Sequence, residues 1–179
     1  MSDGTVIHED AEDYFDAVPV GDGIAVRMAE NVAATLADHV DRLIRFLETG
    51  ETEQRRDGLF KRAASPDDVL KRMFPDAYRD SVDATAFRLR HAAALRDTTA
   101  ARRVHARCAG AAQHVLSPAE ADDWITTFAK AQFLGTPRKG RKTDPTTLWL
   151  AHVQDSVLSA MNTGLFPTIR THGSSRDAT

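Results

Sequence analysis

The feature that most constrains the fold is a stretch rich in alanine and arginine, from about Val82 to Leu116. Alanine is the best helix former because it loses no side-chain entropy in a helix. The stretch therefore predicts one long helix around which the other helices pack. We expect its inner face to be a seam of mostly small side chains, formed by Ala86, Ala93, Ala100, Val104, Cys108, Ala111 and Val115.

Two further helices are predicted before this stretch. From Ala29 to about Thr49, apolar residues recur every three or four positions, which is typical of one face of an amphipathic helix, and Gly50 is suited to end it. A shorter helix follows, with Ser65 as its N-cap and Pro66 in its first turn. Since Pro75 disfavours a helical Phe74, the short helix should end there. At the corner that follows this helix, we expect the side chains of Met73, Phe74 and Tyr78 to pack into the core.

Two helices are predicted after the long stretch. Ser117-Pro118-Ala119-Glu120 has the pattern of a capping box with proline in the first turn. The helix that it opens should bury Trp124, Phe128 and Ala131 and end near Gly135. The last helix should begin at Pro145 and end at Gly164, with an inner face of Trp149, Val153, Val157 and Met161.

These elements predict an all-α fold of about five helices around one long central helix. Gly23–Met28 alternates like a strand. With no clear partner strand in the sequence, we expect it to be a short, isolated extended segment. Residues 23–164 should form a single helical domain, and residues 165–179 a C-terminal tail.

Residues 1–22 contain seven acidic residues and no lysine or arginine. Such a composition favours a flexible, solvated acidic arm. The alternative is an arm that folds onto the basic long helix and screens its charge. The N-terminus does not have the basic and then apolar pattern of a signal peptide. A single cysteine and the lack of an apolar run of about 18 residues predict a cytoplasmic protein without a membrane span.

A row of arginines is the best candidate for a functional surface. At about 100° per residue, one sector of the predicted long helix would contain Arg88, Arg96, Arg103 and Arg107. Guanidinium groups bind phosphates and carboxylates with paired hydrogen bonds. The alternative is a solvated helix flank whose arginines lie along the surface.

Two other features deserve weighing as sites. The loop that contains Arg138, Lys139, Arg141 and Lys142 could contact phosphates, or it is only a flexible basic loop. Cys108 is either a small buried side chain or, if exposed near Arg107, a redox-active thiol. The histidines lack the spacing of a metal site, and no nucleophile motif is present. We therefore predict no metal, no cofactor and no enzymatic activity.

The segment Arg72-Met73-Phe74-Pro75-Asp76-Ala77-Tyr78, with Phe87-Arg88 after it, resembles the signature of the actinobacterial domain-of-unknown-function family 2017. Supporting similarities lie at Gly23–Arg27, at Leu116–Ala121 leading to Trp124, and at Leu148–Asp155. The segment Trp124–Thr136 departs from the family pattern, because the expected Asn, Asp and Arg are absent.

The resemblance implies a cytoplasmic, non-enzymatic regulatory protein. Members of that family are often encoded beside the adaptor of the Clp protease, and some are described as transcriptional regulators. We therefore expect a stress-linked role in transcription, through RNA polymerase, a sigma factor or DNA bound at the basic helix face. The alternative is an accessory or adaptor protein in Clp-dependent proteolysis. An apolar strip between the helices would also suit a homodimer.

Overall fold

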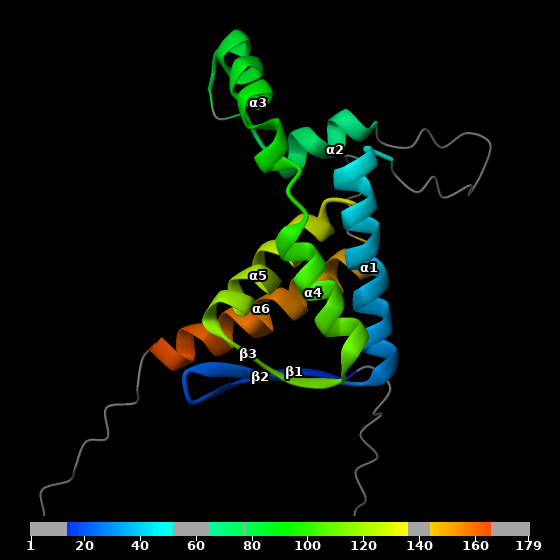
Figure 1. The fold of residues 1–179 in the computed structure, drawn as a ribbon, viewed down its shortest axis with the longest axis vertical. Coiled ribbons are helices and arrows are strands. Elements are labelled where there is room, and N and C mark those ends of the chain that lie inside the picture. Colours follow the sequence, from blue (N-terminus) through cyan, green and yellow to red (C-terminus); the bar gives the residue numbers. More distant parts are fainter. Residues whose placement is uncertain (1–13, 52–64, 77, 136–143, 166–179) are drawn as a thin grey trace, which may run out of the picture.

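The computed structural model describes residues 14–51, 65–76, 78–135 and 144–165. These residues form a three-stranded sheet at the base of a group of helices (Figure 1). In chain order the elements are β1 (Phe15–Val20), β2 (Gly23–Met28), α1 (Glu30–Thr49), α2 (Pro66–Met73), α3 (Ser81–Leu95), α4 (Thr99–Gly110), β3 (Gln113–Leu116), α5 (Pro118–Gln132) and α6 (Pro145–Leu165).

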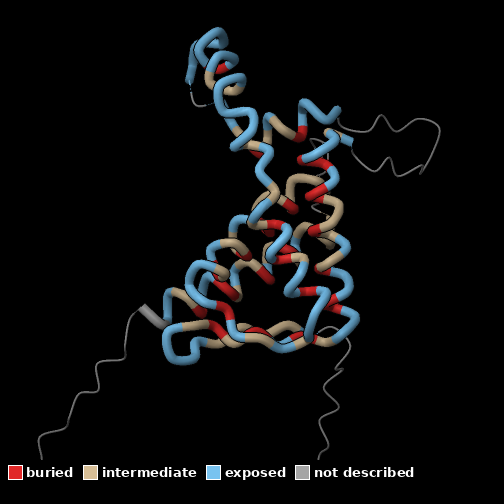
Figure 2. Tube along the Cα trace, in the orientation of Figure 1, coloured by how far each residue is buried: buried red, intermediate tan, exposed pale blue. Residues whose placement is uncertain are grey.

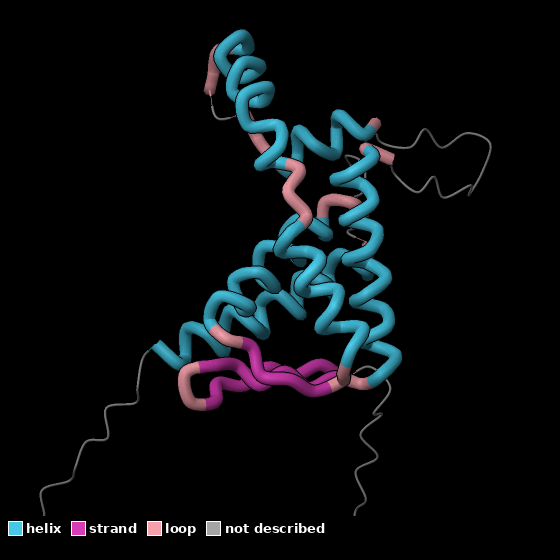
Figure 3. The backbone as a smooth tube through the Cα atoms, viewed as in Figure 1, coloured by secondary structure: helices cyan, strands magenta, loops and turns pink. Residues whose placement is uncertain are grey.

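The sheet shows that the predicted all-α fold is wrong. Strand β2 was expected to be extended but alone, and instead it is the central strand of an antiparallel sheet of order β1-β2-β3 (Figure 3). Ala17 lies opposite Val26 in β1, and His114 lies opposite Val26 in β3. The backbone groups of β2 are thus paired on both sides, which an isolated strand could not achieve.

A tight hairpin connects β1 to β2. Its two linking residues are Gly21 and Asp22, and Gly21 has a φ of 60°. Glycine with positive φ at the first linking position is typical of a type II′ turn, whose twist suits paired strands. Phe15–Val20, which the sequence analysis assigned to an acidic arm, therefore belong to the sheet. The rest of that arm, residues 1–13, lies outside the described residues.

One face of the sheet forms part of the core. The side chains of Ile24, Val26 and Met28 are buried, and the sheet packs against α5 and α6. On the outer face, Val20 and Val115 are exposed. Along β2, buried residues alternate with more exposed ones (Figure 2). This alternation buries one face of the sheet and leaves the other to solvent.

The predicted long helix from Val82 to Leu116 is also wrong. Helix α3 ends at Leu95, and α4 begins at Thr99. Between them, the carboxylate of Asp97 accepts hydrogen bonds from the backbone N–H of Thr99 at 3.0 Å and from its hydroxyl at 2.6 Å. A short aspartate side chain that bonds to nearby backbone competes with helix continuation. After α4, the chain becomes β3 and pairs with β2.

The helices form a continuous core. Helix α1 packs on α4, α4 on α5, and α5 on α6. Glu48, near the end of α1, accepts a hydrogen bond from the Thr98 hydroxyl at 3.3 Å and pairs with Arg102. The largest fully buried side chains include Leu36, Leu43, Phe46, Trp124 and Phe128.

The predicted caps of these helices are confirmed. Gly50 ends α1 with a φ of 73°, and the Ser65 hydroxyl accepts a hydrogen bond from the Asp68 N–H at 3.1 Å. The capping box between Ser117 and Glu120 is present at the start of α5.

Helix α3 stands clear of this core (Figure 1). Ala84 is its only buried residue, and Val82 and Leu89 are 72% and 75% exposed. The predicted corner is only partly confirmed: Met73 is buried, but Tyr78 is 46% exposed. The aromatic ring of Tyr78 contacts Phe87 of α3 instead of the core, with ring centroids 5.8 Å apart.

We predict that Gly23→Ala destabilises the protein by about 1–3 kcal/mol, because overpacking a filled site forces the structure to shift. A Cβ atom at Gly23 would lie 2.6 Å from the backbone oxygen of Leu116. Urea unfolding, followed by circular dichroism, gives the change in the free energy of unfolding.

Gly110→Ala is the matched control. A Cβ atom at Gly110 would meet nothing within 4 Å, and alanine favours the helix. Equal stability of the Gly23→Ala and wild-type proteins would contradict the close approach of β2 and β3.

Candidate functional site

The structure divides the predicted row of arginines between separate elements. Arg88 lies on α3 and Arg96 is the residue that caps its C-terminus, whereas Arg103 and Arg107 lie one turn apart on α4. The break at Asp97 means that these side chains do not share one helix face. The structure thus brings together Arg103 and Arg107 only.

Arg103 is held by a carboxylate of the neighbouring helix. Its Nε donates to Asp123 Oδ2 at 2.7 Å, and its Nη2 donates to Asp123 Oδ1 at 2.9 Å. This two-point arrangement is the strong geometry of an arginine–carboxylate pair. The hydrogen bond to Asp123 and the negative charge of this carboxylate raise the pKa of Arg103.

Arg107 makes a corresponding pair with Glu120. Its Nε donates to Glu120 Oε1 at 2.9 Å, and its Nη2 contacts the same oxygen. The other oxygen, Oε2, accepts from the backbone N–H of Ser117 at 2.9 Å as part of the capping box. The bond from this backbone N–H, with the Arg107 bond second, lowers the pKa of Glu120 to about 2.

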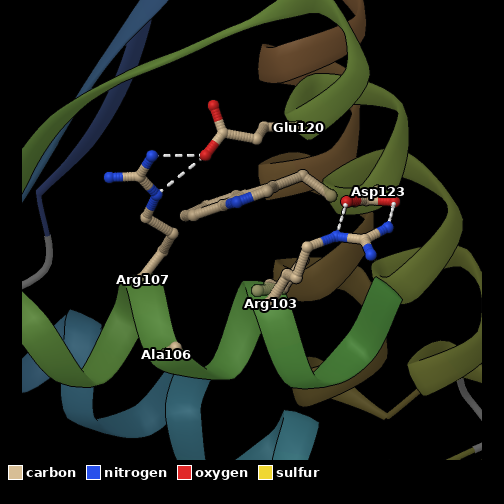
Figure 4. A pocket seen from close by; sticks show the side chains of 7 residues that line it. Arg103, Ala106, Arg107, Glu120 and Asp123 are labelled. Atoms are coloured by element: carbon tan, nitrogen blue, oxygen red, sulfur yellow. Dashed lines mark hydrogen bonds and ion pairs between the residues drawn. The ribbon is translucent and has the colours of Figure 1, made fainter. Parts of the chain in front are cut away.

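A small groove lies between these two ion pairs. It has a volume of about 260 Å³, and its lining includes Val104, Ala106 and Trp124 between the two arginines and the two acids (Figure 4). Each guanidinium group faces one carboxylate, so the charges along the groove are balanced. A phosphate ligand would have to displace a carboxylate from an arginine. In this geometry the groove is a neutral, partly apolar surface rather than a phosphate site.

The residue beneath the groove, Trp124, belongs to an aromatic cluster. Its ring centroid lies 5.4 Å from that of His114, 5.5 Å from that of Phe128 and 6.4 Å from that of Phe15. Trp124 Nε1 and both ring nitrogens of His114 are buried without a hydrogen-bonding partner among the described residues. The cluster joins α5 to β1 and β3.

The electrostatic environment favours a neutral His114. Burial lowers the pKa of His114, and the positive charge of Arg107 lowers it further. A neutral imidazole can pack against an indole without leaving a buried charge unpaired. This pairing could not be predicted from the sequence, because His114 lies within the long helix expected from Val82 to Leu116.

The remaining basic candidates differ in their surroundings. Arg88 donates to the Phe74 carbonyl at 3.1 Å and pairs with Asp76 at 2.7 Å, which ties α3 to the chain before it. In the parts of the chain that the structure describes, Arg79 and Arg96 are exposed and have no acidic partner. The candidates Arg138, Lys139, Arg141 and Lys142 lie outside the described residues.

Cys108 is buried within α4, with only 3% of its surface exposed. Burial raises the pKa of its thiol to about 12. Because the thiolate is the reactive form, this environment opposes a role as an accessible redox sensor. The position of Cys108 agrees with the other alternative, a small side chain buried in the core.

The described residues were also compared with the requirements of a metal site and of a membrane-spanning helix. Within residues 14–51, 65–76, 78–135 and 144–165, no group of three or more His, Cys, Asp or Glu side chains is arranged to hold a metal ion. None of the helices found in these ranges combines the length and apolar character needed to cross a bilayer.

Residues 14–161 match the model of a family that is described as a domain of unknown function, DUF2017. The chain belongs to this family. The matched region begins at β1 and extends into α6, so the DUF2017 domain includes both the sheet and the helices. No curated protein and no solved structure matches the chain.

We predict that acid weakens this domain partly through Glu120. The pKa of Glu120 is about 2 in the folded protein, against 4.5 for an ordinary glutamate. A lowered pKa contributes stability above pH 4.5 that is lost as the pH falls toward 2. Unfolding in urea at a series of pH values should therefore show a shallower acid-side slope for Glu120→Gln than for wild type.

Arg107→Gln is the control for this experiment. It removes the arginine but keeps the backbone N–H of Ser117, which is the larger cause of the low pKa. We expect an intermediate slope. Identical slopes in all three proteins would show that Glu120 is not held in this way.

We predict that the Cys108 thiol reacts slowly with a disulfide reagent at neutral pH and rapidly in denaturant. Its burial and its pKa of about 12 both restrict the thiolate. Ala109→Cys in a Cys108→Ala background provides an exposed neighbour on the same helix. Equal native labelling rates for Cys108 and the Ala109→Cys variant would contradict a buried thiol.

Proposed function

We propose that this DUF2017 protein is a non-enzymatic, cytoplasmic regulatory protein that modulates transcription by binding a macromolecular partner. The observation that carries the proposal is helix α3. A helix that leaves most of its residues exposed contributes little to the core, and its apolar and charged side chains are free to contact a partner.

The chemistry of α3 favours a protein partner over bare DNA. Val82 and Leu89 offer exposed apolar area, and Arg79 and Arg96 flank the two ends of the helix. Exposed apolar area beside arginine is typical of surfaces that bind other proteins. DNA binding would instead require several cations free to contact phosphates. RNA polymerase or a sigma factor is therefore the first candidate, and DNA is the alternative.

The paired arginines of α4 are not part of this surface. Reversing the charge of Arg103 would place two acids together at Asp123, which would perturb the contact between α4 and α5. Arg79 and Arg96 provide the better test, because neither has an acidic partner to lose among the described residues.

The double variant Arg79→Glu with Arg96→Glu should lose partner binding while its helical content stays unchanged. Binding is measured by capture on tagged protein from an actinobacterial lysate at low and moderate salt, with mass spectrometry as the readout. We expect wild type to recover RNA polymerase or a sigma factor. Recovery should decrease by at least about tenfold in the variant, since removing and reversing interface charges costs more than 1.4 kcal/mol.

Lys71→Glu is the control, because it reverses an exposed charge on α2, outside α3, that has no acidic partner to lose among the described residues. It should bind as wild type does. Equal loss of binding in both variants would show that net charge, not α3, decides the result. Recovery of Clp components alone would favour the adaptor role in proteolysis, and binding only to duplex DNA would favour direct DNA contact.

A further inference from the structure

The exposed side of α3 has the sequence spacing of a helix-pairing surface. Val82, Ala86, Leu89 and Ala93 follow one another at intervals of four, three and four residues, and all four are exposed. This is the spacing of the apolar positions of a coiled coil. We call these four residues the α3 seam. Ala86 and Ala93 were predicted to face the core, but in the structure both are exposed to solvent.

The side chains on the opposite side of α3 contact other residues of the same chain. Ala84 is 5% exposed, and Phe87 contacts both Tyr78 and His91 with ring centroids 5.8 Å and 4.3 Å apart. At about 100° per residue, these residues lie across the helix from the seam. The seam therefore has no partner among the described residues, although the other face of the same helix does.

An antiparallel arrangement of two seams pairs large side chains with small ones. If the helices cross at the centre of the seam, Val82 lies in the layer of Ala93 of a second copy, and Ala86 lies in the layer of Leu89. Alternating large and small residues across an interface lets the layers interlock. A parallel arrangement would place leucine against leucine and alanine against alanine, which leaves gaps in the alanine layers.

The charges beside the seam also favour the antiparallel arrangement. Asp83 and Arg90 flank the same side of the seam, one heptad apart. In an antiparallel pair, Asp83 of each copy faces Arg90 of the other, which makes two ion pairs by symmetry. Neither Asp83 nor Arg90 has an ion-pair partner among residues 14–51, 65–76, 78–135 and 144–165. The Arg90 guanidinium donates only to the Ala86 carbonyl of its own helix, at 3.3 Å.

We propose that α3 pairs with α3 of a second copy of this chain in an antiparallel, two-fold symmetric dimer through the α3 seam. The seam spans about 17 Å along the helix, at about 1.5 Å per residue. Such a short seam buries less than the roughly 1,200 Å² of a standard interface. The dimer is therefore weak and reversible.

Sedimentation of the full chain over a range of about 1 µM to about 1 mM tests this dimer. Wild type should change from monomer to dimer as the concentration rises. Leu89→Glu should remain monomeric throughout, because it places two carboxylates in the apolar seam. Since Leu89 is 75% exposed, this variant should keep its fold, and circular dichroism checks that it does.

Leu148→Glu is the matched control, because Leu148 is 59% exposed on α6, away from the seam. It should dimerise as wild type does. A protein that remains monomeric at every concentration overturns the proposal. A dimer that Leu89→Glu leaves intact overturns it as well, because that dimer uses another surface.

An exchange of charges tests the orientation. Asp83→Arg and Arg90→Asp should each weaken the dimer by about tenfold, because each change turns two attractive pairs into repulsive ones. The double variant restores opposite charges and should recover most of the wild-type affinity. Failure to recover would overturn the antiparallel arrangement.

This inference goes beyond the proposed function but shares Val82 and Leu89 with it, so the dimer and a partner compete for the same face of α3. The dimer is measured on the purified protein without any other partner. Arg79 and Arg96 lie three residues before Val82 and three after Ala93, so Arg79 of one copy lies nearest Arg96 of the other in the antiparallel pair. Arg79→Glu with Arg96→Glu replaces one like-charge pair with another and should keep the dimer. Loss of partner capture in that variant and loss of the dimer in Leu89→Glu are therefore separate outcomes.

Discussion

The pairing of β2 with strands on both of its sides is the interaction on which the rest of the structure depends. It joins residues near the start of the chain to β3, which follows α4. Because β3 must lie beside β2, the chain has to leave the helical conformation after Gly110 and then turn into α5. Trp124 of that helix packs beside Phe15 and His114, so the sheet also fixes how α5 lies against α4.

That placement determines the chemistry of the arginines. With α5 beside α4, Arg103 meets Asp123 and Arg107 meets Glu120, and two groups that could bind an anion become internal ion pairs. Their side chains remain partly exposed, so the pairs add modestly to stability and mainly define which face of α4 contacts α5. Among the described residues, arginines without an acidic partner lie on α3 and at its two ends, at Arg79, Arg90 and Arg96.

Features that depend on a few neighbouring residues could be predicted from the sequence. The caps at Ser65 and Ser117 and the apolar face of α1 are of this kind, since their hydrogen bonds and periodicity are local. The sheet could not be assembled in the same way, because β3 has only four residues and follows an alanine-rich helix. Gly21-Asp22 between β1 and β2 was a usable hairpin signal.

The pairs between α4 and α5 join residues that are far apart in sequence, so no local pattern indicates them. The break at Asp97 had a local sequence signal, but that signal was weak. An aspartate followed by two threonines was a local stop signal, but the high helix propensity of the alanines on both sides concealed it.

The position of α3 divides the molecule into two parts with different tolerance of sequence change. In the helices and strands of the core, a new side chain must fit a close-packed interior, so most substitutions reduce stability. On α3 almost every side chain faces solvent, and a substitution there has little effect on the free energy of unfolding. The recognition properties of this domain can therefore change through α3 while the core that supports it stays the same.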